Sequence, residues 1–230
     1  MSFSKTIGIL GGMGPSASAA MYQKIIQLCQ EQYSAVQDTD YPKIVLYSLP
    51  LTGFDETGIV DATSVLQQLH AGIAKLVHAG CDCIVMACNT VHVFYDQLQA
   101  MCPVPIVHIV EETVHAVSGH HVVGVLSSET TAKMGLYASA LKSQNAEAVA
   151  PSTMQQAKVT DAITHVMAGL QSNADVAVLQ AISQSLQSQG ATAIILGCTE
   201  LPLVLQQQHV ALPLFDAVTI GAKVTLAFAQ

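Results

Sequence analysis

The sequence predicts an α/β protein made of two similar halves, each with a mainly parallel sheet flanked by helices. Short β-branched runs alternate with longer segments of helical period, which is typical of parallel α/β architecture. The run "IGILGGMG" that starts at Ile7 matches "VGVLSSET" from Val123. Later in each half, "GCDCIVMAC" from Gly80 matches "GATAIILGC" from Gly190. Two copies of one α/β unit would explain both matches.

The short runs rich in β-branched and apolar residues are expected to form the strands. They span residues 6–10, 43–49, 83–87, 106–110, 121–126, 193–196 and 212–215. The longer segments between them have apolar residues at the spacing of helices that pack on a sheet. These helices are expected over residues 16–32, 59–78, 132–143, 154–170, 175–189 and 217–228.

The composition excludes several classes of partner. The 230 residues are 51% hydrophobic and 10% charged, with a net charge of −8 and no arginine. Without a basic run, neither nucleic acid nor an anionic membrane surface is an expected partner. No apolar segment reaches the ~18 residues of a membrane helix, and "TIGILGGMGPS" is too broken for a signal peptide. We expect a cytoplasmic protein whose six cysteines are free thiols.

Each half places one cysteine just past the carboxyl end of a strand. Cys88 and Cys198 close the matched runs that open at Gly80 and Gly190. Ligands of open α/β sheets bind at this edge, so both cysteines would line one cleft if the halves face each other. The residues that follow each cysteine are suited to a helix start, and a thiol at the amino end of a helix ionises more easily.

One thiolate and one thiol on opposite sides of a bound carbon acid form a two-base catalyst. The thiolate removes a proton from one face and the thiol delivers a proton to the other, which inverts the carbon centre. This predicts racemisation or epimerisation without a cofactor and without a metal. Main-chain N–H groups in the turn around Met13 and Gly14 are expected to stabilise charge on the substrate carboxylate.

Several blocks in one order along nearly the whole chain resemble the aspartate/glutamate racemase family, whose enzymes work without pyridoxal phosphate. The blocks are "IGILGGMGPSAS", "ACNTVHVFYDQL", "PIVHIVEETV", "GVLSSETTAKMGLY", "AIILGCTELPLVL" and "PLFDAVTI".

The resemblance implies two pseudo-symmetric Rossmann-like domains, with Cys88 and Cys198 as the acid/base pair for a small amino-acid substrate. The first domain is expected over residues 1–116 with 211–230, and the second over 117–210. Members of the family are often dimers, so a homodimer is expected. The residues implied around the amino and carboxylate groups of the substrate are Met13, Asn89, Thr90, Ser128 and Thr199, and the N–H donor Gly14 joins this set.

One loop departs from the family pattern. Relatives that prefer aspartate usually carry an arginine after the second strand, but here "SLPLTGFDETG" has Asp55 and Glu56 in its place. A lysine common in the second half has no clear match; His165 lies nearby, and the nearest lysine is Lys158. Losing a bidentate cation weakens the binding of an acidic side chain. We expect an amino acid whose side chain need not be acidic, which leaves acidic, neutral and basic substrates open.

Two side chains near the cysteines have two interpretations each. His92 lies four residues after Cys88 and either tunes the thiol or serves packing. Glu200 either tunes Cys198 or favours the start of a helix.

The sequence also allows other interpretations. Cys88 and Cys198 could be structural thiols, and the Cys81 and Cys83 pair fits alternate strand positions better than a metal site. The glycines of "GILGGMG" do not keep the dinucleotide spacing, and no P-loop occurs. Alternative functions are a decarboxylase or another isomerase of the wider superfamily, or a protein that binds a small molecule or senses redox state.

Overall fold

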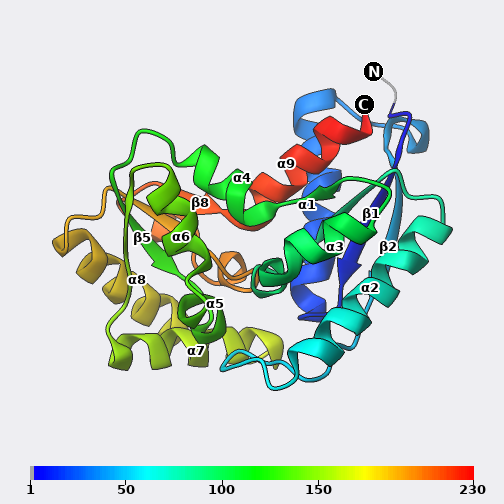
Figure 1. Ribbon diagram of the computed structural model, residues 1–230. Coiled ribbons are helices and arrows are strands. Elements are labelled where there is room, and N and C mark those ends of the chain that lie inside the picture. Colours follow the sequence, from blue (N-terminus) through cyan, green and yellow to red (C-terminus); the bar gives the residue numbers. More distant parts are fainter. Residues whose placement is uncertain (1–2) are drawn as a thin grey trace. The chain divides into compact units, whose positions relative to one another are not determined.

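The computed structural model describes residues 3–230, which divide into two compact units. The first unit contains the described residues up to Phe54, together with Val60–Ile109 and Val218–Gln230. The second unit contains Asp55–Ile59 and Val110–Ala217. The predicted α/β class is confirmed, since each unit holds a parallel sheet with helices packed against it (Figure 1).

The sheet of the first unit has the strand order β2-β1-β3-β4. Its strands are β1 (Thr6–Gly11), β2 (Lys43–Ser48), β3 (Cys83–Met86) and β4 (Ile106–Val107), all parallel. The chain passes from β1 to β2 on one side and then from β2 back across β1 to β3 on the other. Because both connections are right-handed crossovers, α1 and α2 lie on opposite faces of the sheet. The helices of this unit are α1 (Pro15–Tyr33), α2 (Ala62–His78), α3 (Tyr95–Met101) and most of α9 (Ala217–Ala229).

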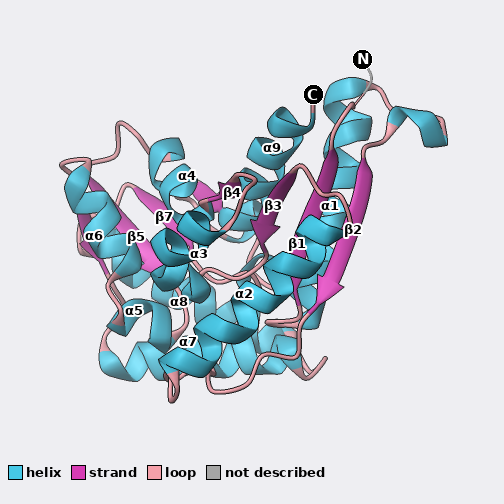
Figure 2. Cartoon of the chain, turned by 45° about the vertical axis from the view of Figure 1, so that its right-hand side comes forward, coloured by secondary structure: helices cyan, strands magenta, loops and turns pink. Residues whose placement is uncertain are grey.

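The second unit repeats this topology with the strand order β6-β5-β7-β8. Its parallel strands are β5 (Val122–Leu126), β6 (Glu147–Val149), β7 (Ala193–Leu196) and β8 (Leu214–Asp216), and Figure 2 labels the central pair, β5 and β7. Its helices are α4 (Ile109–Ala116), α5 (Glu129–Lys133), α6 (Leu136–Ser143), α7 (Thr153–Met167) and α8 (Asn173–Ser188). Leu126, Ile163, Leu179 and Leu196 belong to the buried apolar cluster that joins this sheet to α7 and α8.

The repeat extends to individual hydrogen bonds. Just past β3, the Ala87 N–H donates to the Leu10 carbonyl at 2.9 Å, and past β7 the Gly197 N–H donates to the Leu126 carbonyl at 2.7 Å. Both bonds join the residue before a cysteine to the last or next-to-last residue of the neighbouring strand. The main chain therefore presents Cys88 and Cys198 at equivalent places on the two sheets.

The structure corrects the expected elements at several points, and the helix expected over 59–78 begins only at Ala62. The strand expected over 106–110 stops at Val107, because α4 begins at Ile109. The helix expected over 132–143 is two helices, α5 and α6, because Gly135 interrupts it with a φ of 65°.

The compact units also divide the chain differently from the expected domains. Strand β8 pairs with β7, with Phe215 beside Ile195, so the second unit extends to Ala217 rather than to residue 210. It also begins at Val110, and it includes the separate segment Asp55–Ile59.

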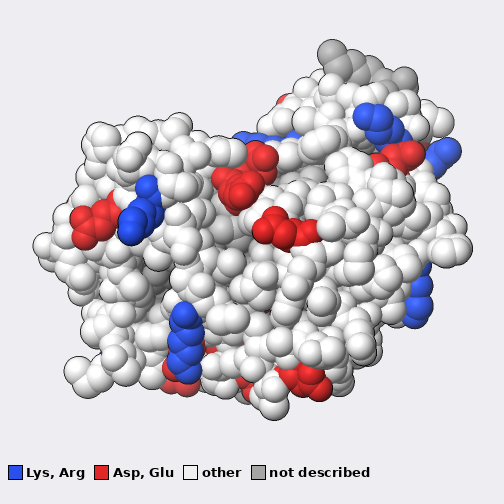
Figure 3. Space-filling view, viewed as in Figure 1, with Lys and Arg blue, Asp and Glu red and all other residues white. Residues whose placement is uncertain are grey.

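The surface carries few charges. On the face that Figure 3 shows, lysines and acidic residues form small separate groups on a largely uncharged surface. Among residues 3–230, no helix combines the length and apolar character needed to cross a membrane.

Candidate active site

The first unit forms its part of the candidate site at the turn after β1. Gly12 adopts a φ of +94°, and a Cβ there would lie 2.4 Å from the main-chain nitrogen and oxygen of Leu49, so only glycine fits. The Gly12 N–H donates to Ser18 Oγ at 2.8 Å, and the same hydroxyl donates to the Gly14 carbonyl at 2.9 Å. These bonds hold Met13, whose side chain is buried, and Gly14 at the amino end of α1.

Cys88 follows the neighbouring strand β3 and is buried, as are Asn89 and Thr90 after it. The segment beyond it is not an α-helix but a short 3₁₀ helix, η2 (Thr90–Phe94), for which Asn89 is the N-cap. A helical segment does begin just after Cys88, as expected, but its first turns are 3₁₀ rather than α-helical. This 3₁₀ segment runs directly into α3 (Tyr95–Met101), so Cys88 precedes a helical stretch whose first turns are 3₁₀.

His92 is fully buried and contacts the main chain of Cys88. Its Nδ1 lies 2.9 Å from the Cys88 carbonyl oxygen, which can only accept, so Nδ1 carries the proton. Its Nε2 then accepts from the Ile109 N–H at 3.3 Å. Burial, with a smaller effect from the nearby His108, lowers the pKa of His92 to about 4. The ring is therefore neutral at physiological pH, and its hydrogen bonds fix the backbone that carries Cys88.

The second unit places Ser128 after β5 and Cys198 after the neighbouring β7. Ser128 is buried and is the N-cap of α5, accepting from the Thr131 N–H at 3.2 Å. Cys198 is half-buried, and its Sγ donates to Glu200 Oε2 at 3.0 Å. Thr199 Oγ1 donates to the same carboxylate oxygen at 3.1 Å, and both Thr199 and Glu200 are buried.

The helix start predicted after Cys198 is a short 3₁₀ turn. This turn is the 3₁₀ helix η3 (Leu201–Leu203), with Glu200 as its N-cap residue, but the Glu200 side chain makes no capping bond. The Glu200 carboxylate instead accepts the Cys198 thiol hydrogen. Of the two interpretations of Glu200, the geometry supports direct contact with the thiol.

Tyr137 is a neighbour of Cys198 that sequence reasoning missed. It is buried, and burial raises the pKa of its hydroxyl, as do the nearby Cys198 and Asp216. A Cβ on Gly197, the residue before Cys198, would lie 2.5 Å from the Tyr137 ring, so this ring packs directly on the turn. The only sequence signal was that Tyr137 closes the block "GVLSSETTAKMGLY".

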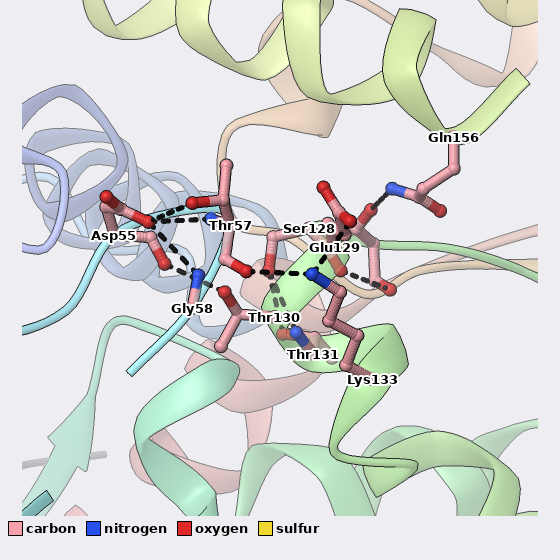
Figure 4. Close-up of polar contacts among 10 residues, drawn as sticks. Asp55, Thr57, Gly58, Ser128, Glu129, Thr130, Thr131, Lys133 and Gln156 are labelled. Atoms are coloured by element: carbon pink, nitrogen blue, oxygen red, sulfur yellow. Dashed lines mark hydrogen bonds and ion pairs between the residues drawn. The ribbon is translucent and has the colours of Figure 1, made fainter. Parts of the chain in front are cut away.

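The segment Asp55–Ile59, which we call the strap, belongs to the second unit although it lies between β2 and α2 in the chain. Thr130 of α5 donates from its N–H to the Glu56 carbonyl at 3.0 Å and from Oγ1 to the Asp55 carbonyl at 2.9 Å. Lys133 Nζ donates to the Thr57 carbonyl at 3.3 Å. Figure 4 shows the strap beside α5 and Ser128.

The candidate residues thus gather within each unit at the carboxyl ends of the two central strands. Met13, Gly14, Cys88, Asn89 and Thr90 do so in the first unit, and Ser128, Cys198 and Thr199 in the second. His165 does not join them, because it pairs with Asp175 between α7 and α8. Over residues 3–230, no group of three or more metal-binding side chains is assembled.

These features define a class of protein: two repeated parallel α/β units, each with a cysteine followed by small polar residues after its third strand. The profile of the Asp/Glu/Hydantoin racemase family matches residues 10–225, and the chain belongs to this family.

Individual relatives agree with this assignment over most of the chain. The chain is 34% identical over 225 residues to the broad specificity amino-acid racemase RacX of Bacillus subtilis (strain 168), covering 96% of both chains. An aspartate racemase homologue from Pyrococcus horikoshii OT3 has a TM-score of 0.82 at 27% identity, covering 98% of this chain and 99% of that one. The aspartate racemase of Picrophilus torridus has a TM-score of 0.84 at 25% identity, over 98% of this chain and 94% of that one.

Proposed function

We propose that this protein is an amino-acid racemase that inverts the α-carbon by proton transfer between Cys88 and Cys198, without pyridoxal phosphate. The observation that carries the proposal is the equivalent placement of the two cysteines in the repeated units, at strand ends held by matching hydrogen bonds. Membership of the racemase family supports it. Thiols are suited to the task because their ordinary pKa of about 8.5 makes both protonation states accessible near neutral pH.

The reaction conserves protons. One cysteine, as thiolate, takes the α-proton and becomes a thiol, while the bonding electrons remain on the substrate as a carbanion conjugated with its carboxyl group. The other cysteine gives its thiol proton to the opposite face and becomes a thiolate. Main-chain N–H groups around Met13 and Gly14, with the polar side chains of Asn89, Thr90, Ser128 and Thr199, would hold the amino and carboxylate groups. Donors aimed at developing charge are usually the largest single catalytic contribution.

The side chains that contact the two cysteines differ, which suggests different roles for them. Glu200 accepts the Cys198 hydrogen at 3.0 Å, which favours Cys198 as the thiol that donates a proton. His92 contacts the Cys88 carbonyl and not its thiol, so it acts as a positioning residue.

The substrate side chain need not be acidic. The chain contains no arginine, and the strap carries two acids where an acid-binding cation would be expected. The relative RacX is named for broad specificity, which agrees with a site that does not demand a second carboxylate.

Exchange of the α-hydrogen tests the proposal. The protein, without added pyridoxal phosphate, is incubated in D₂O with a panel of acidic, neutral and basic L-amino acids, followed by NMR and chiral chromatography. We expect deuterium at the α-carbon together with the D-enantiomer. Binding without exchange, or loss of carbon dioxide in place of inversion, would contradict the proposal.

Single variants test the two-base mechanism. Cys88→Ser and Cys198→Ser should each lower kcat by roughly 10²–10⁴-fold, the usual cost of losing one acid/base group. Cys102→Ser, a buried cysteine at the end of α3, is the matched control and should retain activity. Full racemisation by either active-site variant would overturn the mechanism.

We also infer a homodimer from the family resemblance. Analytical ultracentrifugation of the purified chain should give about twice the 24.2 kDa monomer mass, and a monomer at all concentrations would contradict this inference.

A further inference from the structure

The strap is fixed to the second unit through its main chain. The three bonds from Thr130 and Lys133 all go to carbonyl oxygens, at Asp55, Glu56 and Thr57. Thr130 is buried, so its two bonds are at least partly shielded from water, whereas the Lys133 bond is exposed; together they hold the strap against α5. Because these bonds use main-chain carbonyls, the strap backbone should keep its place if the Glu56 side chain is changed.

The Asp55 carboxylate is used within the strap itself. Its Oδ1 accepts from Thr57 N–H at 2.8 Å, Thr57 Oγ1 at 2.7 Å and Gly58 N–H at 3.1 Å, as Figure 4 shows. The hydrogen bonds from Thr57 lower the pKa of this carboxyl, which is therefore charged at neutral pH. Asp55 builds the turn and has little capacity left for a ligand.

Glu56 is different. It is half-buried, yet its carboxylate forms no hydrogen bond or ion pair with any residue from 3 to 230. The lysine nearest in sequence to the docking point, Lys133, is already paired with Glu129 at 2.8 Å. A half-buried carboxylate that is not engaged by the protein is available to the cationic group of a ligand.

The main chain of Glu56 lies one hydrogen bond from α5, whose N-cap is Ser128. Ser128 is among the residues proposed to hold the substrate, so the strap borders the site from within the same unit. A carboxylate here would attract a cationic side chain and repel an acidic one.

We propose that Glu56 determines specificity by pairing with the positively charged end of a basic amino acid, such as lysine. This inference rests on the proposed racemase function and names the substrate class of that site. Hydrogen bonds between ionised partners are stronger than neutral ones, so the pair should favour lysine over an uncharged side chain of similar length.

The test compares L-lysine with L-methionine, which is unbranched and uncharged, and with L-glutamate. In the variant Glu56→Gln, kcat/KM for lysine should fall by about 10- to 100-fold while that for methionine changes less than about threefold. Retained turnover of methionine shows that the variant is folded. Glu56→Lys should further raise the ratio of glutamate to lysine turnover.

Glu129→Gln is the matched control. Glu129 lies on α5, the helix that holds the strap, and its carboxylate is already paired with Lys133. It should leave the lysine to methionine ratio unchanged. An equal fall for lysine and methionine in Glu56→Gln would give Glu56 a purely structural role and overturn the inference. Wild-type protein that racemises methionine but not lysine would overturn it too, and would leave the racemase function standing. Wild-type protein that exchanges no α-hydrogen in any amino acid would instead overturn the proposed function.

Discussion

Acid should destabilise this protein through His92 before its carboxylates become protonated. In the folded protein, burial lowers the pKa of His92 from 6.5 to about 4, whereas the unfolded chain regains the ordinary value. Between these two values the unfolded state binds a proton that the folded state does not. The stability that the neutral ring contributes is therefore present above pH 6.5 and is lost as the pH falls toward 4.

The size of this effect follows from the two pKa values. A shift of one pKa unit corresponds to about 1.4 kcal/mol, so the full difference limits the effect of His92 to about 3 kcal/mol. Between pH 7 and pH 5, the linkage relation gives a loss of about 2 kcal/mol. This is a large fraction of the 5–15 kcal/mol that stabilises a typical domain.

Urea unfolding followed by far-ultraviolet circular dichroism at pH 7 and pH 5 measures the loss. In the variant His92→Asn, the side-chain amide can still donate to the Cys88 carbonyl but cannot be protonated. The wild type should lose about 2 kcal/mol more than this variant over the two pH values. His70→Gln, at an exposed position of α2, should behave as the wild type. Equal losses in wild type and His92→Asn would refute the assignment of a buried neutral ring.

Two further variants test the packing and the electrostatics of the second unit. Gly197→Ala places a Cβ 2.5 Å from the Tyr137 ring and should cost about 1–3 kcal/mol in thermal unfolding, whereas an unchanged Tm would mean that the ring moves aside. Asp175 accepts from His165 Nδ1 at 2.7 Å and from Ser172 N–H at 2.8 Å. Burial would raise the pKa of this carboxyl, but these bonds outweigh it and the pKa is lowered. Its stabilisation is present above the ordinary pKa and is lost as the pH falls below it, so Asp175→Asn should cost about 1–2 kcal/mol at neutral pH and little at pH 2, and an equal cost at both would contradict this.

Strand positions near the two cysteines were predictable because the sequence repeats itself there. The strands expected at 83–87 and 193–196 occur at Cys83–Met86 and Ala193–Leu196, where every residue is buried. Strands buried on both faces have continuous apolar runs, and such runs bounded by glycine are strong signals.

Other elements gave weaker signals. The run at 106–110 is apolar throughout, and periodicity alone does not show that the strand ends at Val107 and α4 starts at Ile109. Strand β6 (Glu147–Val149) has three residues and only partial burial, so it left no pattern to detect.

The environment of each cysteine depends on side-chain directions that spacing does not determine. His92 follows Cys88 at a helical interval, but in the 3₁₀ segment its ring turns to main-chain atoms of Cys88 and Ile109. The approach of Tyr137 to Gly197 joins residues far apart in the chain, and no short motif encodes it. The strap was visible in the sequence only as a departure from a family pattern, and its docking on Thr130 required the structure.

The repeat makes the two cysteines equivalent in the main chain but not in their surroundings. In each unit, the N–H of the residue before the cysteine donates to a carbonyl of the neighbouring strand, and this bond places the cysteine in the same way in both copies. The side chain two residues after Cys198 is a carboxylate that accepts its hydrogen, whereas the residue two places after Cys88 is Thr90.

A two-base racemase needs one thiol and one thiolate at any moment, and identical surroundings would give neither state a preferred site. We therefore expect this difference to set which cysteine is protonated before substrate binds. Glu200→Gln, which keeps an acceptor but removes the charge, should lower kcat for one direction of racemisation more than for the other in single-turnover measurements. Equal changes in both directions would place the asymmetry elsewhere.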